Sequence, residues 1–334
     1  MILQYNEIYI KESKFKMLTD MPLEDLKKYK PPQTKKDDFT EFWQKTKATS
    51  KNQPLNVKVK KIDYIIKDMD VNKVYYDGYG GSRICGYYLL PKLSGPHPVI
   101  LFFHGYGGNK QKISYYLKWV LMGYAVMAID IRGQMGESID NKIYPAPSAV
   151  GYMTKGIFSR EDYYYRGVYM DCIRAIEFLE TRKEIDINRL CVTGMSQGGG
   201  LSLATAALDL RPKLVIAEIP YLCHYKRAVE WAEEFKNVTY LEFRSIIKKY
   251  PEKEEEMFNT LTYFDNLNLC SWIKARTVIT CAMKDACCPP STIFAVYNHI
   301  KVEKYIEIMP YYEHGLEAVA NFEERKLEYI KMYL

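Results

Sequence analysis

A serine flanked by glycines at fixed spacing is the part of this sequence best suited to do chemistry. The pentapeptide Gly194-Met195-Ser196-Gln197-Gly198 has the form G-x-S-x-G, with an apolar run before it and small, helix-compatible residues after it. Small neighbours allow a serine to occupy a strained strand-to-helix turn, where its hydroxyl is exposed as a nucleophile. The pattern predicts acyl transfer through Ser196. The alternative is a glycine-rich turn with an incidental serine.

A serine nucleophile needs a general base, and the chain has only five histidines. In proteins with such an elbow the acid and the histidine follow the serine in the chain, which excludes His97 and His104. Of the other three, His224 opens a helical stretch and His299 lies in a helical pattern, whereas His314 follows a strand. Catalytic groups gather at the carboxyl ends of strands. We therefore expect His314 to be the base and His104 to buttress its own loop.

The base in turn needs a carboxylate to orient its ring and stabilise the imidazolium. The aspartates after the serine are Asp209, Asp265 and Asp285. Asp209 ends the elbow helix and Asp265 closes a helical stretch, whereas Asp285 follows the apolar strand 277–281. The strand-end position favours Asp285, and the alternative is that this aspartate only caps a turn.

Two backbone N–H groups should stabilise the oxyanion that forms during acyl transfer. One is expected from Gln197, which follows the nucleophile, and the other from Tyr106 in the glycine-rich loop 104–108. We also expect the Tyr106 side chain to wall the acyl side of the site.

These residues need a sheet to position them. Alternating residues from Val57 to Leu90 predict antiparallel strands at one edge, and continuous apolar runs at 99–103, 124–130, 214–219 and 277–281 predict buried strands. Helical patterns separate the buried runs, so the fold class is α/β, a doubly wound and mostly parallel sheet. Residues 222–269 read as a helical, cap-like insertion. We expect an amino-terminal extension at 1–18 and a single domain at 19–334.

A second short motif, Arg132-Gly133-Gln134, follows the buried strand 124–130 and is expected to support the site. A guanidinium at a strand end is partly desolvated and needs a carboxylate. Glu218 ends a neighbouring candidate strand, so we predict that Arg132 and Glu218 pair beneath the site.

Composition narrows the class of protein. The 334 residues are 48% hydrophobic and 26% charged with a net charge of +6 and no basic stripe, so nucleic acid is not a favoured partner. No apolar run reaches the length of a membrane span, and no export signal is evident, so we expect a cytoplasmic protein with eight reduced cysteines. Cys287 and Cys288 are adjacent and lack the paired spacing of a zinc site. We expect no metal and no cofactor.

Several of these motifs together resemble the acetyl xylan esterase and cephalosporin C deacetylase family of carbohydrate esterases, within the α/β-hydrolase superfamily. The resemblance extends over nearly the whole chain after the first ~18 residues. Its motifs are the 22–26 segment, the 102–108 loop, the R-G-Q triplet 132–134, the 151–157 segment, the S-Q-G-G-G elbow at 196–200, the 220–224 segment and the 288–292 segment.

The resemblance implies a serine esterase with an α/β-hydrolase fold that removes acetyl groups from small acetylated sugars and from cephalosporin C. It also implies an intracellular homo-hexamer, a trimer of dimers, and a triad of Ser196, Asp285 and His314. Two positions depart from the family pattern: Gly315 replaces a glutamate after the histidine, and Met135 replaces a glycine after R-G-Q. The alternatives left open are a broader carboxylesterase or peptidase on the same fold, and a non-catalytic binding protein.

Overall fold

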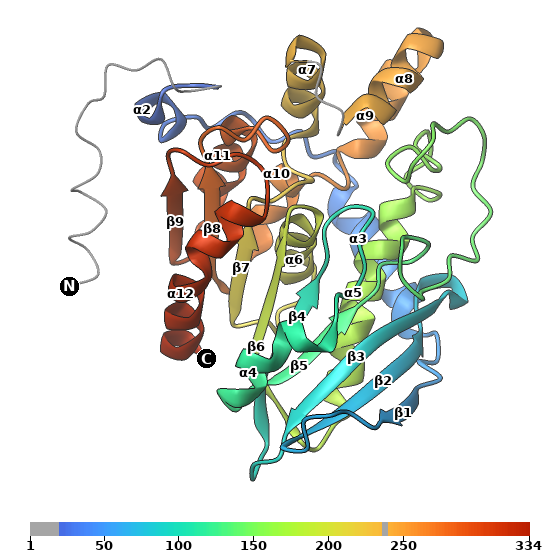
Figure 1. Cartoon of the computed structure of the whole chain (residues 1–334). Helices are drawn as coiled ribbons and strands as arrows, with labels where there is room; N and C mark the ends of the chain where they lie inside the picture. The colour runs from blue at the N-terminus through green and yellow to red at the C-terminus, as the bar shows by residue number, and fades with distance from the viewer. Residues whose placement is uncertain (1–19, 236–239) are drawn as a thin grey trace.

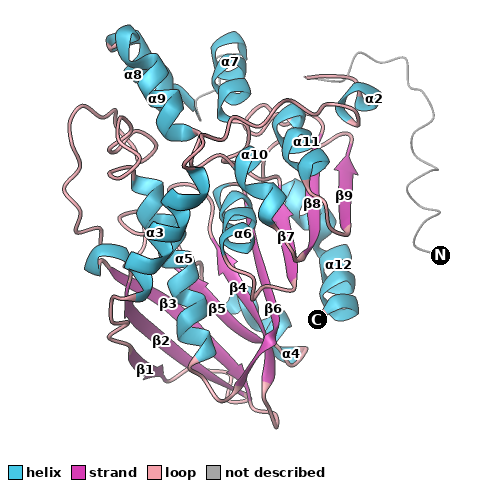
Figure 2. Cartoon of the chain, turned by 180° about the vertical axis from the view of Figure 1, so that it is seen from behind, coloured by secondary structure: helices cyan, strands magenta, loops and turns pink. Residues whose placement is uncertain are grey.

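The computed structural model describes residues 20–235 and 240–334, which form one nine-stranded sheet covered by helices on both faces (Figures 1 and 2). The strand order across the sheet is β1-β2-β3-β5-β4-β6-β7-β8-β9. In chain order the strands are β1 (Lys58–Ile62), β2 (Met69–Asp77), β3 (Arg83–Pro91), β4 (His97–Phe103), β5 (Ala125–Ile129), β6 (Ile185–Met195), β7 (Leu214–Glu218), β8 (Arg276–Ala282) and β9 (Lys304–Met309).

The sheet combines an antiparallel edge with a parallel centre, as the two kinds of sequence pattern predict. The strands β1, β2 and β3 pair antiparallel, and β2 alternates between buried and less buried residues, whereas β5, β4, β6, β7, β8 and β9 pair in parallel. The parallel strands at the centre are continuous runs of buried residues because helices cover both of their faces. All their carboxyl ends therefore meet at one edge of the sheet.

The helices, in chain order, are α2 (Leu23–Leu26), α3 (Phe39–Lys51), α4 (Leu117–Leu121), α5 (Tyr164–Glu180), α6 (Gln197–Leu208), α7 (Tyr225–Phe235), α8 (Leu241–Lys249), α9 (Glu254–Leu261), α10 (Asn266–Leu269), α11 (Pro290–His299) and α12 (Leu316–Tyr333). Helices α3, α5, α6 and α11 cover one face, and α4 and α12 cover the other (Figure 2). Helices α7, α8 and α9 extend beyond the edge where the parallel strands end (Figure 1). We call α7–α9 the cap helices.

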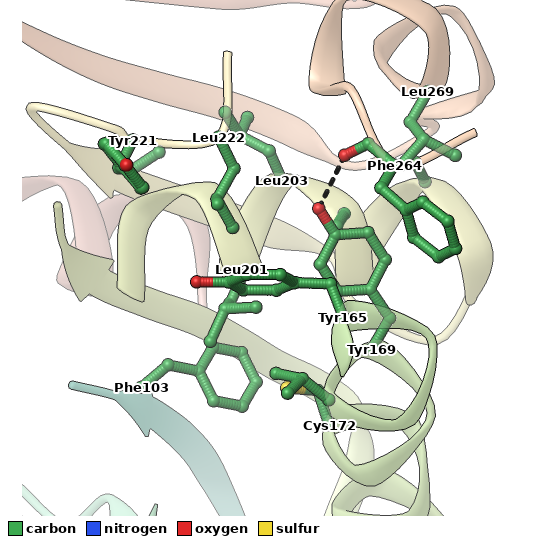
Figure 3. Packing of buried hydrophobic residues seen from close by; sticks show 14 of the residues in the cluster. Phe103, Tyr165, Tyr169, Cys172, Leu201, Leu203, Tyr221, Leu222, Phe264 and Leu269 are labelled. Atoms are coloured by element: carbon green, nitrogen blue, oxygen red, sulfur yellow. Dashed lines mark hydrogen bonds between the residues drawn. The ribbon is translucent and has the colours of Figure 1, made fainter. Parts of the chain in front are cut away.

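Alternate residues of one strand enter two different cores because successive side chains of a strand point to opposite faces. In β4, Val99, Leu101 and Phe103 join the larger core under α5 and α6, while Ile100 and Phe102 join the core under α4 and α12. Figure 3 shows part of the larger core, in which the hydroxyl of Tyr169 donates to the Phe264 carbonyl oxygen at 2.7 Å. The Tyr169 ring is buried as apolar surface while its hydroxyl still finds an acceptor.

The amino-terminal segment packs against the late part of the chain. The Thr34 N–H donates to the Asn268 side-chain oxygen at 2.8 Å, and the indole N–H of Trp43 donates to the Tyr263 carbonyl at 3.0 Å. Asp20 precedes α2 and accepts hydrogen bonds from the Ser291 N–H and from Arg227. The helix itself begins at Leu23, with Pro22 at its N-cap.

The segment after the loop 104–108 forms a short 3₁₀ turn (Ile113–Tyr116) that runs directly into α4, and the last helix, α12, begins at Leu316, just after His314. Within residues 20–235 and 240–334, the structure contains no helix with the length and apolarity that crossing a bilayer requires.

Candidate active site

Ser196 lies on the turn between β6 and α6 with φ 56° and ψ −117°, a backbone conformation that residues with a Cβ rarely adopt. The turn is held from both sides, because the Ser196 N–H donates to the Glu218 carbonyl at 2.8 Å and the Tyr221 N–H donates to the Ser196 carbonyl at 2.9 Å. Neighbouring strand β7 thus fixes the serine in its strained conformation.

The glycines of the elbow are required by close backbone contacts. A Cβ on Gly198 would lie 2.0 Å from the Phe103 carbonyl oxygen, and a Cβ on Gly194 would lie 2.3 Å from the same atom. No side chain fits at either distance, so the end of β4 and the start of α6 pack backbone against backbone. The G-x-S-x-G spacing follows from this packing.

The three residues predicted to act together are brought together. His314 Nε2 lies 3.1 Å from Ser196 Oγ, and His314 Nδ1 lies 2.7 Å from Asp285 Oδ2. Asp285 is fully buried, and its other oxygen, Oδ1, accepts the N–H groups of Cys287 and Cys288 at 2.8 and 2.7 Å. The carboxylate is therefore fixed by backbone donors and holds a proton on His314 Nδ1, which leaves Nε2 facing the serine hydroxyl.

Cys287, which sequence reasoning left out of the site, is a close neighbour of this histidine. Burial opposes protonation of His314, but hydrogen bonds and charge from Asp285 and from Cys287 outweigh it and raise its pKa to about 10. The pKa of the Cys287 thiol is lowered to about 5 by a hydrogen bond with Cys288 and by His314. Cys287 and His314 are thus electrostatically coupled, and each favours the charged form of the other.

The loop expected to supply a second oxyanion donor lies against the elbow. A Cβ on Gly105 would lie 4.0 Å from the Ser196 Cβ, so the loop 104–108 passes beside the nucleophile. Gln197 is the first residue of α6, where a backbone N–H has no intrahelical acceptor. His104 buttresses this loop: the Ile131 N–H donates to His104 Nε2 at 2.9 Å, and His104 Nδ1 lies 2.8 Å from the Gly105 carbonyl oxygen.

Two glutamine side chains join the loop to the elbow. Gln134 and Gln197 exchange amide hydrogen bonds of 3.0 and 3.1 Å, and Gln134 also accepts the Gly107 N–H at 2.9 Å. The Tyr165 hydroxyl donates to the Gln197 amide oxygen at 2.8 Å. These buried amides are satisfied by one another, so the relative position of the two expected oxyanion donors is fixed before any substrate arrives.

The predicted pairing of Arg132 with Glu218 is wrong. Arg132 makes a bidentate pair with Asp171 of α5, with both distances 2.6 Å, and Glu218 pairs with Lys326 of α12 at 2.5 Å. Helices α5 and α12 lie on opposite faces of the sheet (Figures 1 and 2). Arg132 follows β5 and Glu218 ends β7, so β4 and β6 lie between them in the sheet, and their side chains pair with helices on opposite faces.

The remaining residue of the triplet, Gly133, has φ +65°, and a Cβ there would lie 2.9 Å from the Asp140 Cβ. The turn at Gly133 directs Arg132 toward α5 and Gln134 toward the elbow. The R-G-Q triplet therefore connects α5, the loop 104–108 and the elbow helix.

A glutamate of the cap helices reaches the same loop, and sequence reasoning missed it. Glu242 of α8 accepts hydrogen bonds from the Tyr106 hydroxyl and from the Met153 N–H, the latter at 2.8 Å. The Tyr106 hydroxyl also accepts the Tyr152 N–H at 2.7 Å. Burial raises the pKa of Glu242, although Tyr106 and Met153 favour its charged form. Glu242 belongs to an amphipathic, charge-rich stretch, in which no sequence signal distinguishes it from its neighbours.

Gly315 follows the histidine at φ 157°, and nothing lies within 4 Å of the place where its Cβ would be. A glutamate there would have space but would need a backbone conformation that favours glycine. The chain thus departs locally from the family pattern just after His314, while His314 keeps both of its partners.

Comparison with known proteins gives a consistent result. The model of the family described as acetyl xylan esterase (AXE1) matches residues 16–333. The acetyl esterase Axe7A of Xylanibacter ruminicola is 30% identical over 305 residues, which make up 88% of this chain and 66% of that protein. This chain thus spans slightly less than two thirds of that relative's length.

Two solved acetyl xylan esterases have closely similar structures. One from a Paenibacillus species is 43% identical with a TM-score of 0.90, and one from a Thermoanaerobacterium species is 31% identical with a TM-score of 0.88. Each comparison covers 94% of this chain and 100% of the other. The fold is that of the α/β hydrolases, which more distant solved hydrolases share.

Proposed function

The chain belongs to the acetyl xylan esterase family, and we propose that it is a serine esterase that deacetylates small acetylated carbohydrates, xylo-oligosaccharides among them, and cephalosporin C. The observation that carries the proposal is the pair of hydrogen bonds from His314, 3.1 Å to Ser196 Oγ and 2.7 Å to Asp285 Oδ2. A serine and a base in this contact, with the base oriented by a buried carboxylate, are the parts that covalent acyl transfer needs.

In the proposed mechanism, Ser196 Oγ attacks the acetyl carbonyl carbon while His314 Nε2 takes the hydroxyl proton. The tetrahedral intermediate collapses to an acetyl-enzyme, and His314 returns the proton to the leaving sugar hydroxyl. Water then attacks the acyl carbon with the same base, which releases acetate and restores the serine. Asp285 stays ionised throughout and stabilises the imidazolium.

We assign the oxyanion to the backbone N–H groups of Tyr106 and Gln197. The reciprocal amide bonds between Gln134 and Gln197, and the bond from the Gly107 N–H to Gln134, support this assignment because they hold both donor segments in one position. Donors fixed in advance stabilise the developing charge without reorganisation during the reaction.

Acetyl specificity is proposed to come from Tyr106. Its hydroxyl is held by Glu242 and the Tyr152 N–H, and its ring lies 5.4 Å from the Tyr152 ring, so the side chain cannot swing aside freely. An open pocket would gain about 0.8 kcal/mol from each buried methylene, whereas forcing methylenes into a packed one costs about 1–3 kcal/mol.

The experiment is a series of 4-nitrophenyl esters from acetate to octanoate. We expect kcat/KM to fall about tenfold or more from acetate to butyrate, and kcat on acetate to fall at least about a thousandfold in Ser196→Ala. A maximum at hexanoate or octanoate would indicate a broader carboxylesterase, and faster cleavage of peptides a peptidase. Activity within tenfold of wild type in Ser196→Ala would remove the serine assignment and leave a binding protein as the better interpretation.

The assembly and location are also proposals. We propose a homo-hexamer, a trimer of dimers, which size-exclusion chromatography with light scattering would test. A cytoplasmic location is supported by seven of the eight cysteines, which are buried free thiols. Limited proteolysis would test the proposed division into an extension at 1–18 and one domain at 19–334 with its insertion at 222–269: it should remove the extension first.

A further inference from the structure

Four potential metal ligands lie together beside the nucleophile. Asp285, Cys287, Cys288 and His314 each offer one ligand atom, and these atoms all lie within 4.8 Å of one another. We call this group the thiol–imidazole cluster. We propose that it is an inhibitory site for a thiophilic divalent cation, represented by Zn²⁺, with Cys287, Cys288 and His314 as the ligands. The binding half of the proposal is independent of the proposed function, whereas the inhibitory half rests on it.

The local fold builds the cluster from two adjacent strand ends. After β8, Asp285 Oδ1 accepts the N–H groups of both following cysteines, and this turn brings the two thiols back toward the carboxylate. Pro289 and Pro290 then lead into α11. His314 arrives from the loop after β9, the neighbouring strand. Two thiols adjacent in sequence thus meet a histidine from a separate loop.

The donor set fits a thiophilic cation. Zinc binds cysteine thiolate and histidine nitrogen in tetrahedral geometry, with distances of about 2.3 and 2.0 Å, which places ligand atoms about 3.3–3.8 Å apart. Because the ligand atoms of the cluster all lie within 4.8 Å of one another, they exceed that geometry by no more than about 1–1.5 Å, which small side-chain rotations can close. His314 already contacts Asp285, and a carboxylate on a metal-bound histidine is a common outer-shell partner.

Binding at His314 is incompatible with the triad. Nδ1 of this ring is engaged by Asp285 and Nε2 faces Ser196, so a cation on either nitrogen removes the general base. The cluster is also accessible to solvent. The His314 side chain is 21% exposed, and Cys287 is the only one of the eight cysteines that is not buried. A cation entering the active site meets Cys287 and His314 first.

Only one other group of this kind lies within the described residues, and it already holds a cation. Cys85, Asp130 and Glu137 form that group, but Lys110 Nζ lies 2.6 Å from Asp130 and 2.9 Å from Glu137. The ammonium occupies the position that a metal would need. Cys85→Ala is therefore the matched control for a cysteine near carboxylates outside the thiol–imidazole cluster.

The binding experiment uses the reduced full chain carrying Ser196→Ala, so that it does not depend on esterase activity. Cd²⁺ is the probe, because its thiolate complexes absorb in the ultraviolet, and titration calorimetry gives the affinity. We expect one site with thiolate absorption. Affinity should fall at least about tenfold in Cys287→Val and remain unchanged in Cys85→Ala. Unchanged affinity in Cys287→Val, or its loss in Cys85→Ala, would overturn the proposed ligands. Cys288→Ala gives a second reading if Cys287→Val does not fold, and should show the same loss.

The inhibition experiment uses 4-nitrophenyl acetate and the wild-type chain. Zn²⁺ should abolish hydrolysis and a chelator should restore it. The Zn²⁺ concentration that halves the rate should rise at least about tenfold in Cys287→Val, each variant being compared with its own metal-free rate. Binding without loss of activity would overturn the inhibitory role. A wild-type chain that binds Cd²⁺ but hydrolyses no ester would instead contradict the proposed function.

Discussion

Two regions border Ser196: the elbow helix α6 packed on β4, which we call the floor of the site, and the cap helices α7–α9, which we call the roof. The two regions are held in place by different kinds of contact. All twelve residues of the elbow helix α6 are buried, whereas α8 of the cap buries only Phe243 and Ile246. The floor is fixed by backbone packed on backbone, as at Gly198 and the Phe103 carbonyl. The roof reaches the site through side chains: Glu242 accepts from the Tyr106 hydroxyl and the Met153 N–H, and the Trp231 indole N–H donates to the Ala286 carbonyl at 3.1 Å. The floor therefore tolerates almost no change, while the roof can be altered without loss of the fold.

The sharpest test of that contrast is Gly198→Ala. The added Cβ would stand 2.0 Å from the Phe103 carbonyl oxygen, so β4 and α6 must separate. We expect the free energy of unfolding to fall by more than about 4 kcal/mol, measured by urea denaturation. Gly105→Ala is the control, because its Cβ would meet nothing closer than 3.8 Å, and it should unfold near the wild-type midpoint. Equal stability of the two variants would mean that the floor is not held by close packing.

The buried ion pair of Arg132 and Asp171 tests whether the contacts that join the R-G-Q triplet to α5 also stabilise the fold. Asp171→Asn leaves a guanidinium buried without its bidentate partner. Breaking a buried ion pair on one side costs about 3 kcal/mol or more, which thermal unfolding should reveal. Glu24→Gln, which removes the partner of Lys27 in an exposed pair, should leave the melting temperature unchanged. A similar loss in both variants would contradict the distinction.

The base of the cap gives a pH-dependent prediction. Burial lowers the pKa of His224 to about 4, with Arg227 and Lys226 adding to the effect. The unfolded chain then binds a proton at this residue below its ordinary pKa of about 6.5 while the folded chain does not, so stability falls as the pH drops from about 6.5 to about 4. We expect this residue to cost about 2 kcal/mol at pH 5. In His224→Gln the loss between pH 7 and pH 5 should be smaller by that amount, and an unchanged pH profile would refute the assignment.

The smallest effect is expected where the roof touches the floor. Glu242→Gln removes the charged acceptor of the Tyr106 hydroxyl and of the Met153 N–H. We expect kcat/KM on 4-nitrophenyl acetate to fall about tenfold with little change in unfolding midpoint, because charge-assisted hydrogen bonds are worth about 1.5–3 kcal/mol. Glu252→Gln on the same insertion is the control and should keep wild-type kinetics. A loss of stability comparable to that of Gly198→Ala would mean that the roof supports the fold as well.

Local steric rules explain why much of the floor could be predicted. The elbow, the parallel pairing of the buried central strands and the positions of Ser196, Asp285 and His314 follow from glycine spacing, apolar runs and strand ends. Each of these depends on a few consecutive residues. The sequence therefore predicts which segments meet at the sheet edge and places three side chains there.

The sequence could not predict which way a side chain points, or which residues far apart in the chain come into contact. The sequence pattern pairs Arg132 with Glu218 as residues at the ends of neighbouring strands, but β4 and β6 separate these strands and the two side chains point to opposite faces. Cys287 and Cys288 were set aside because zinc spacing was sought along the chain, whereas His314 reaches them from another strand end. No feature of the sequence around Glu242 distinguishes this glutamate from the neighbouring charged residues. In each case the decisive partner is far away in sequence, and only the packed structure brings the two together.

The long-range contacts of the amino-terminal segment have a consequence for synthesis. Trp43 and Thr34 bond to Tyr263 and Asn268, partners that leave the ribosome more than two hundred residues later. At about 5–20 residues per second, the segment waits roughly 10–50 s with its aromatic face uncovered. During that interval the nascent chain offers a chaperone an apolar target, and translation speed becomes a determinant of yield.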